Sequence, residues 1–139
     1  VLNSWKAGEF MTPMTSIVGI EIMKPSPDAY TKPIVVLIDE MSGSGGDAFP
    51  AYMKGYGRAT LVGTRTMGLG GHVEEQPNLH YSQLSLRMTK SLFFRPDGVE
   101  VENNGAVPDM PYTITRDDFM YGYKNYQQFY LDVLASKIP

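Results

Sequence analysis

Residues 34–50 read IVVLIDEMSGSGGDAFP. The β-branched run 34–38 is typical of a strand that is buried on both faces of a parallel sheet. The glycine-rich stretch 42–47 predicts a tight turn, and residues 48–56 have the spacing of a helix. Because residues 59–63 form a second short apolar strand, the unit predicts a right-handed βαβ crossover and an α/β fold.

Two residues define the predicted helix more closely. Pro50 fits a first helical turn, where its missing N–H costs nothing. Gly57 lies directly after the last helical position, where a left-handed residue commonly ends a helix. We therefore expect the helix to begin near Ala48 and to end before Gly57.

The whole chain divides into three predicted parts. Residues 1–33 carry four prolines and predict an extended, irregular lead, with a short strand over residues 17–22. Residues 34–115 form the predicted core, and residues 116–139 a C-terminal helical segment. The chain begins at Val1 without an initiator Met, and we expect it to be a piece of a longer protein.

Short elements are predicted after the crossover. Residues 83–88 alternate polar and apolar side chains and predict a half-buried strand, and residues 91–95 predict another. The sequences at 96–98 and 103–105 predict turns. Thr115 with Asp118 three positions later predicts a helix start, and a closing amphipathic helix follows it.

The composition excludes several classes of function. Lys and Arg number 12 against 15 Asp and Glu, a net charge of −3, so the chain lacks the cation excess that nucleic-acid binding requires. There is no run of 18 apolar residues, and we expect no membrane span. The chain has no cysteine, and His72 and His80 are too isolated to predict a zinc site. We expect neither a metal nor a cofactor.

Ser44 is the candidate nucleophile. A serine on a sharp turn between a buried strand and a helix has an exposed hydroxyl, and the N-terminus of the helix favours negative charge beside it. The backbone N–H of Gly45 could then hold an oxyanion. The same geometry would equally bind a phosphate or cap the helix, so these residues alone leave three interpretations open.

Three separated segments together resemble a known family. The first joins the residues quoted above to GRATLVGTRTMGLGG (57–71), the second is RPDGVEVENNGAVPD (95–109), and the third is TRDDFMYGYKNY (115–126). In this order and approximate spacing they are similar to the tail-specific (C-terminal processing) serine protease superfamily. Within it, the branches of the chlamydial protease-like activity factor and of the tricorn core protease are the most similar. The resemblance covers roughly residues 30–134.

The resemblance implies a fold and a set of catalytic roles. The fold would be a crotonase/ClpP-like ββα spiral core with additional short strands and a C-terminal helix. Ser44 matches the nucleophile of the family, and the N–H of Gly45 matches an oxyanion donor. Glu102 matches the carboxylate that orients the catalytic base, a role that makes chemical sense because a serine hydroxyl needs a base of fixed tautomer. Without the resemblance, Glu102 would be taken as a solvated carboxylate beside a turn.

The chain departs from the family at the base. The processing-protease branch has a lysine in a Gly-Lys-Gly run, where this chain has Leu69, and leucine cannot take a proton. The tricorn-like branches have a histidine upstream of the serine, but no histidine precedes Ser44 here. We therefore expect a missing upstream segment to supply the base. His72, with Gly70 and Gly71, is predicted to contact substrate.

The predicted function is that of a serine endopeptidase segment that hydrolyses peptide bonds through an acyl-enzyme on Ser44. Its expected partners are a polypeptide substrate, the His-bearing N-terminal segment of the same protein and a second copy in a homodimer. This chain alone is expected to be inactive or nearly so. By analogy with related bacterial proteases the location is extracytoplasmic, with the cytoplasm as the alternative. Two other functions stay open: a non-catalytic peptide-binding or scaffolding domain of the same fold, and a self-contained hydrolase using Ser44 and His72.

Overall fold

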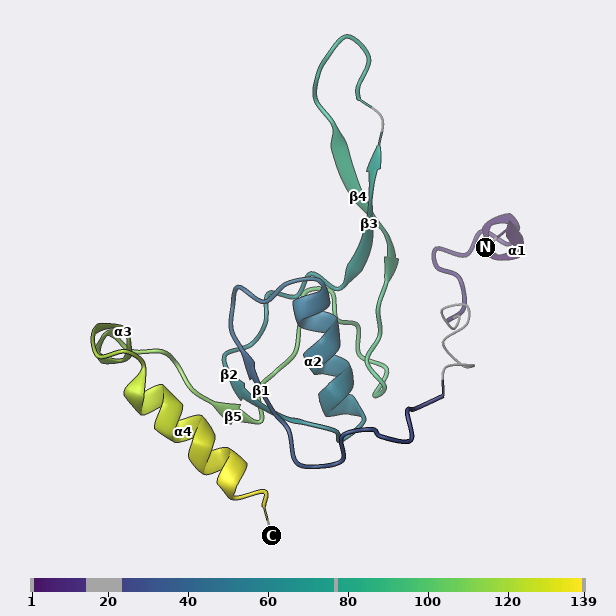
Figure 1. The fold of residues 1–139 in the computed structure, drawn as a ribbon. Helices are drawn as coiled ribbons and strands as arrows, with labels where there is room; N and C mark the ends of the chain where they lie inside the picture. The colour runs from purple at the N-terminus through teal and green to yellow at the C-terminus, as the bar shows by residue number, and fades with distance from the viewer. Residues whose placement is uncertain (1, 15–23, 77, 139) are drawn as a thin grey trace. The chain divides into compact units, whose positions relative to one another are not determined.

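The computed structural model describes residues 2–14, 24–76 and 78–138 and divides into two compact units, Val1–Thr31 and Lys32–Pro139 (Figure 1). In the first unit, helix α1 spans Leu2–Lys6, which differs from the extended lead predicted there. The strand predicted over residues 17–22 lies outside the described residues. No helix within the described ranges is long and apolar enough to cross a membrane.

The second unit is built on a small parallel sheet. Its strands are β1 (Val35–Ile38), β2 (Thr60–Gly63) and β5 (Met110–Pro111), in the order β1-β2-β5. Helix α2 (Gly45–Gly55) connects the two parallel strands β1 and β2, which confirms the βαβ unit (Figure 1). The sequence did not predict β5, because two residues carry no periodicity.

Burial on both faces holds for β2 and not for β1. Leu61 and Val62, on opposite faces of β2, are both fully buried. In β1, however, Leu37 is 45% exposed, so the expectation for residues 34–38 was wrong on that face. The face of β1 that carries Leu37 is therefore only partly covered by other described residues.

Helix α2 begins three residues earlier than predicted. It starts at Gly45 because the backbone of Ser44 already turns, with Asp47 in its first turn. Pro50 therefore lies beyond the first turn, which corrects its expected position. At the other end the prediction is confirmed: Gly57 has φ +63°, and the N–H of Arg58 donates to the carbonyl of Met53 at 2.7 Å.

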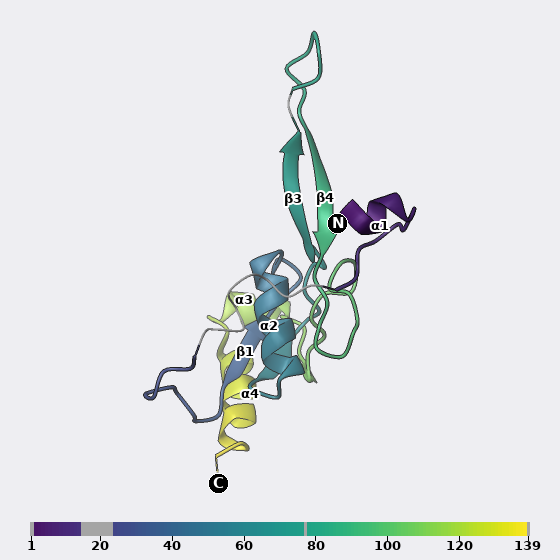
Figure 2. The same ribbon diagram turned by 90° about the vertical axis from the view of Figure 1, so that its right-hand side faces the viewer.

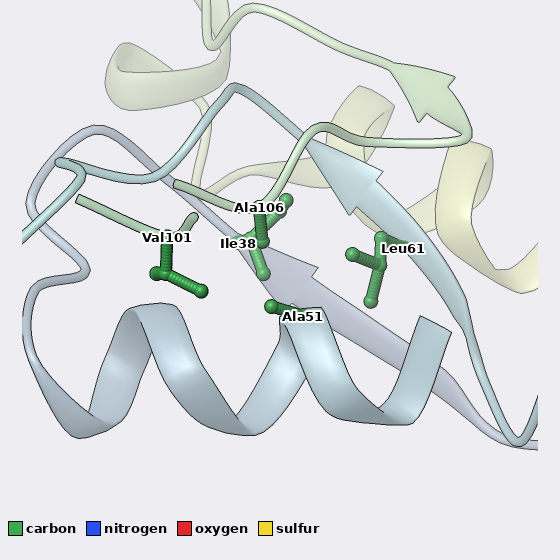
Figure 3. Packing of buried hydrophobic residues seen from close by; sticks show 5 residues of the cluster. All are labelled: Ile38, Ala51, Leu61, Val101 and Ala106. Atoms are coloured by element: carbon green, nitrogen blue, oxygen red, sulfur yellow. The ribbon is translucent and has the colours of Figure 1, made fainter. Parts of the chain in front are cut away.

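The hydrophobic core lies between α2 and the sheet. It contains five small or medium apolar side chains that come from four separate segments (Figure 3): Ile38, Ala51, Leu61, Val101 and Ala106. The core thus joins α2 to β1, β2 and the segment that contains residues 101–106.

Residues 71–92 form a long antiparallel hairpin. Its strands are β3 (Gly71–Gln76) and β4 (Leu86–Leu92), with an irregularity between His72 and Val73. Figure 2 shows the hairpin extending away from the sheet. The structure has one continuous strand where two were predicted, and Leu86 and Met88 are each nearly half exposed, so the predicted half-buried face is absent.

The C-terminal helices agree with the sequence pattern. They are α3 (Arg116–Met120) and α4 (Lys124–Ala135). The N–H of Asp118 donates to Thr115 Oγ1 at 3.2 Å, and the buried Asp118 carboxylate accepts from the Tyr112 hydroxyl and from the N–H of Tyr126. This carboxylate therefore joins both helices to the segment that follows β5.

Candidate active site

Ser44 lies where the chain passes from β1 into α2. It is the N-cap of the helix, with φ +57° and ψ −110°, a conformation that non-glycine residues rarely adopt. Such strain costs about 1–3 kcal/mol and concentrates at functional sites. The residue is exposed, and its hydroxyl makes no side-chain capping hydrogen bond. Ser44 and Asp47 also occupy the N-cap and N3 positions of a capping box, so the cap stays open beside the nucleophile and the phosphate site.

The backbone amides around Ser44 differ in whether they donate a hydrogen bond within the protein. The N–H of Ser44 donates to Asp47 Oδ2 at 2.8 Å, and the N–H of Gly46 donates to the carbonyl of Gly43 at 2.8 Å. The N–H of Gly45 makes no hydrogen bond to any described residue. At the N-terminus of α2, this amide is available to a ligand.

Asp47 is a site residue that the sequence reasoning missed. Its side chain is completely buried, and it accepts backbone hydrogen bonds from Ser44, Gly68 and Leu69, each at 2.8 Å. The available signal was its place in the first turn of α2, where an acidic side chain reaches back to the N-cap amide. Its bonds to residues 68 and 69 had no signal in the sequence.

The loop that contains Gly68 is attached in turn to residues 101–106. The N–H of Thr66 donates to the carbonyl of Ala106 at 3.1 Å, and the N–H of Ala106 donates to Thr66 Oγ1 at 2.7 Å. The N–H of Asn103 donates to the carbonyl of Gly68 at 2.8 Å. The first two segments that carried the family resemblance are therefore in direct contact, although they lie far apart in the sequence.

Glu102 lies on this attached segment. It is partly buried, and its carboxylate makes no hydrogen bond or ion pair with a described residue. A Cβ placed on Gly71 would lie 3.2 Å from Glu102 Oε2, so the carboxylate faces the start of β3. Gly70 is buried against the backbone of residues 101 and 102, where there is no room for a side chain. Of the three predicted substrate contacts, Gly70 thus has a packing reason to be glycine.

His72 lies on the exposed hairpin. Its side chain is 59% exposed, and its Nε2 is 4.0 Å from Glu74 Oε1. No hydrogen bond joins it to Ser44 in the described chain. The structure does not bring these two residues together as a nucleophile and base.

A shallow cavity of about 120 Å³ lies at the carboxyl end of the sheet. Its lining includes Ile38, Glu40, Thr64, Tyr112 and Tyr126, but not Ser44. The hydrogen bonds from the backbone of Glu40 and from the Thr64 hydroxyl lower the pKa of Glu40, whereas burial raises the pKa of Tyr126. No group of three metal-ligating side chains occurs among the residues described.

A family model, a sequence relative and a solved structure each match most of this chain. The family model for peptidase family S41 matches residues 10–112. The chain is 41% identical to an uncharacterized protein of Chlamydia muridarum, over 99% of this chain and 24% of that protein. The solved structure of mature CPAF complexed with lactacystin has a TM-score of 0.81 and 34% identity, covering 96% of this chain and 26% of that one.

A more distant solved structure is similar as well. The crystal structure of the tricorn protease has a TM-score of 0.64 and 30% identity, over 73% of this chain and 10% of that chain. The mixed helix and strand architecture therefore matches both of these structures. The chain spans about a quarter of the length of the Chlamydia muridarum and CPAF relatives.

Proposed function

This chain belongs to peptidase family S41, as its motifs indicated, and from that membership we propose that it is the nucleophile-bearing segment of a serine endopeptidase. The observation that carries the proposal is the backbone of Ser44. Ser44 has a positive φ at the junction of a strand and a helix, and the residue is exposed. A packing or capping role would not require this strained conformation.

The oxyanion donor in this mechanism is the N–H of Gly45. When a serine attacks a peptide carbonyl, negative charge develops on the carbonyl oxygen, and a preorganised amide stabilises it. The Gly45 amide has no hydrogen bond to another described residue that it would lose, and it lies at the positive end of α2. Its neighbours at positions 44 and 46 are already engaged within the protein.

Glu102 would orient the base. Its carboxylate has no partner within the described residues and is only partly buried, so it is free to accept the Nδ1–H of an imidazole. The base itself would be a histidine from an upstream segment of the same protein, because Leu69 cannot act as the lysine of the processing branch. Met41 and Leu69, which are 76% and 49% exposed, are apolar side chains that a further segment could cover.

From the same family membership we also propose the fold, the substrate class, the location and the assembly of the protein. The fold would be a crotonase/ClpP-like ββα spiral, of which β1, α2 and β2 form one turn. The substrate would be a polypeptide, and the protein would act outside the cytoplasm. A homodimer remains the second proposed assembly, after the pairing with the upstream segment.

The proposal is tested by labelling Ser44 with a fluorophosphonate probe, with and without the upstream segment. We expect rapid labelling and peptide hydrolysis only when both parts are present, and loss of both in Ser44→Ala. Removing a member of a triad costs several orders of magnitude in rate, so the chain alone should be almost inactive. Turnover by the chain alone that Ser44→Ala abolishes would contradict the need for an upstream base.

The two alternatives give different results in the same experiment. A non-catalytic binding domain predicts no labelling even when the upstream segment is present. A self-contained Ser44–His72 hydrolase predicts labelling of this chain alone, lost in His72→Ala. His72 is exposed and makes no hydrogen bond to Ser44 within the described residues, which makes this second alternative the weaker one.

A further inference from the structure

The Asp47 carboxylate lies at the centre of the proposed site without belonging to the triad. It is completely buried, and among the described residues no cation pairs with it. Its Oδ1 accepts from the N–H of Gly68, and its Oδ2 accepts from those of Ser44 and Leu69. Burying a carboxylate is costly unless hydrogen bonds satisfy it, and here three backbone amides do so.

These three hydrogen bonds connect two separate parts of the chain. One part is the nucleophile turn, which Asp47 reaches from within α2. The other is the loop around Gly68, whose φ of +87° suits glycine and allows two successive amides to point at the same carboxylate. A Cβ on Gly68 would also lie 3.0 Å from the carbonyl carbon of Asn103, so the loop packs closely on the segment beyond it.

The connection continues to Glu102. The carbonyl of Gly68 accepts from the N–H of Asn103, the residue directly after Glu102. Gly70, two positions further along the loop, packs against the backbone of Glu102 itself. A continuous set of backbone contacts thus runs from the nucleophile turn, through the Asp47 carboxylate and the loop, to the carboxylate that would orient the base.

We propose that Asp47 is a positioning residue, which sets the placement of Ser44 relative to Glu102 by holding the nucleophile turn and the loop in one arrangement. This inference rests on the proposed function for its catalytic consequence. A base that must contact both Ser44 and Glu102 requires their separation to be fixed, and a displacement of about 1 Å can cost on the order of 100-fold in rate. Asp47 itself touches neither the substrate nor the base.

The test compares Asp47→Asn with Asp118→Asn. An asparagine at 47 keeps the shape but offers one acceptor oxygen in place of two, so at least one of the three amides loses its partner. Asp118 provides a matched control, because it is also fully buried and accepts hydrogen bonds from Thr115, Tyr112 and Tyr126 in another part of the fold. Asp47→Ala removes all three acceptors and serves as the stronger variant.

Amide hydrogen exchange on the 139-residue chain gives the first readout. In Asp47→Asn we expect the amides of Ser44, Gly68 and Leu69 to exchange together, at least about tenfold faster than in the wild type. Asp118→Asn should leave these three amides protected. If the loop amides keep wild-type exchange in both Asp47 variants, the proposed coupling is wrong.

Steady-state kinetics of the protein that includes the upstream segment gives the second readout. Asp47→Asn should lower kcat by about 10- to 100-fold while KM stays within about twofold. The substitution disturbs the placement of Ser44 relative to Glu102 and leaves substrate binding intact. Asp118→Asn should keep kcat at a temperature where both variants are folded. A folded Asp47→Asn enzyme with wild-type kcat would overturn the inference. If the wild type shows no Ser44-dependent turnover, the proposed function fails, and hydrogen exchange still decides the coupling.

Discussion

Gly70 packs directly against the backbone of Glu102. A Cβ built on Gly70 would overlap the nitrogen of Glu102 and the carbonyl carbon of Val101, and these are backbone atoms that cannot rotate away. The close approach holds the loop after β2 against the segment that carries the proposed orienting carboxylate. A single methyl group at position 70 would therefore move Glu102.

We predict that Gly70→Ala lowers the free energy of unfolding by roughly 1–3 kcal/mol, the usual cost of forcing extra volume into a packed region. Urea denaturation measures this change. Gly45→Ala is the stability control, because a Cβ there meets nothing within 4 Å and favours the helix. Equal stability of the two variants would contradict the close packing at Gly70.

Leu69→Lys should give the isolated chain a base. The Leu69 side chain reaches the nucleophile turn, since its Cδ1 would lie 3.1 Å from a Cβ placed on Gly43. It is also 49% exposed, so a lysine can be accommodated there. We expect fluorophosphonate labelling of Ser44 to become at least about tenfold faster, and to accelerate with pH as the amine loses its proton. Leu69→Met, which has no base, is the control, and equal labelling of the two variants would refute the prediction.

Asp118 should make stability depend on pH in the acid range. The hydrogen bonds from the backbone and hydroxyl of Thr115 hold the pKa of Asp118 below its ordinary value of 3.8. The folded state therefore gains stability from the ionised carboxylate at higher pH, and loses it as pH falls below 3.8 through the lowered pKa.

Urea titrations between pH 6 and pH 2.5 test this. The free energy of unfolding should fall over the acid part of the range, and Asp118→Asn should reduce the slope. Asp97 and Glu40, whose pKa values hydrogen bonds also lower, should leave a residual slope in that variant. An unchanged slope in Asp118→Asn would show that this carboxylate is not responsible.

Asp109 should contribute more to the free energy of unfolding than Lys54, its ion-pair partner. Asp109 Oδ1 lies 2.8 Å from Lys54 Nζ, and its Oδ2 accepts from the N–H of the buried Leu61 at 2.8 Å. Asp109→Ala leaves that amide without its acceptor and should cost roughly 1–3 kcal/mol of unfolding free energy. Lys54→Gln removes a partly exposed ion pair and a hydrogen bond to the carbonyl of Val107, both at the surface, and should cost about 0–1 kcal/mol. Equal costs in urea denaturation would contradict this order.

The sequence predicted the parallel βαβ unit correctly, and the reason is local. The β-branched run of β1, the glycines before α2 and Gly57 after it each constrain the backbone of their own neighbours. The start of α2 was misplaced because Pro50 suggested a first turn, whereas the backbone of Ser44 and the Asp47 carboxylate begin the helix earlier. The prediction of a half-buried strand over residues 83–88 was also wrong, because alternation of side chains does not reveal whether anything covers the apolar face.

By itself the sequence determined the family, the strand–turn–helix and the candidate roles of Ser44, Gly45 and Glu102. The strand–turn–helix follows from residues that lie within a few positions of one another, whereas the family follows from separated segments taken together, and the predicted role of Glu102 from that resemblance alone. Only the tertiary structure decided that Ser44 adopts a strained positive φ, that the Gly45 amide is free and that His72 stays on an exposed hairpin. It alone revealed that Asp47 joins the nucleophile turn to Gly68 and Leu69. Such contacts depend on where folding places backbone amides more than 20 positions apart, and an amide carries no side-chain signature in the sequence.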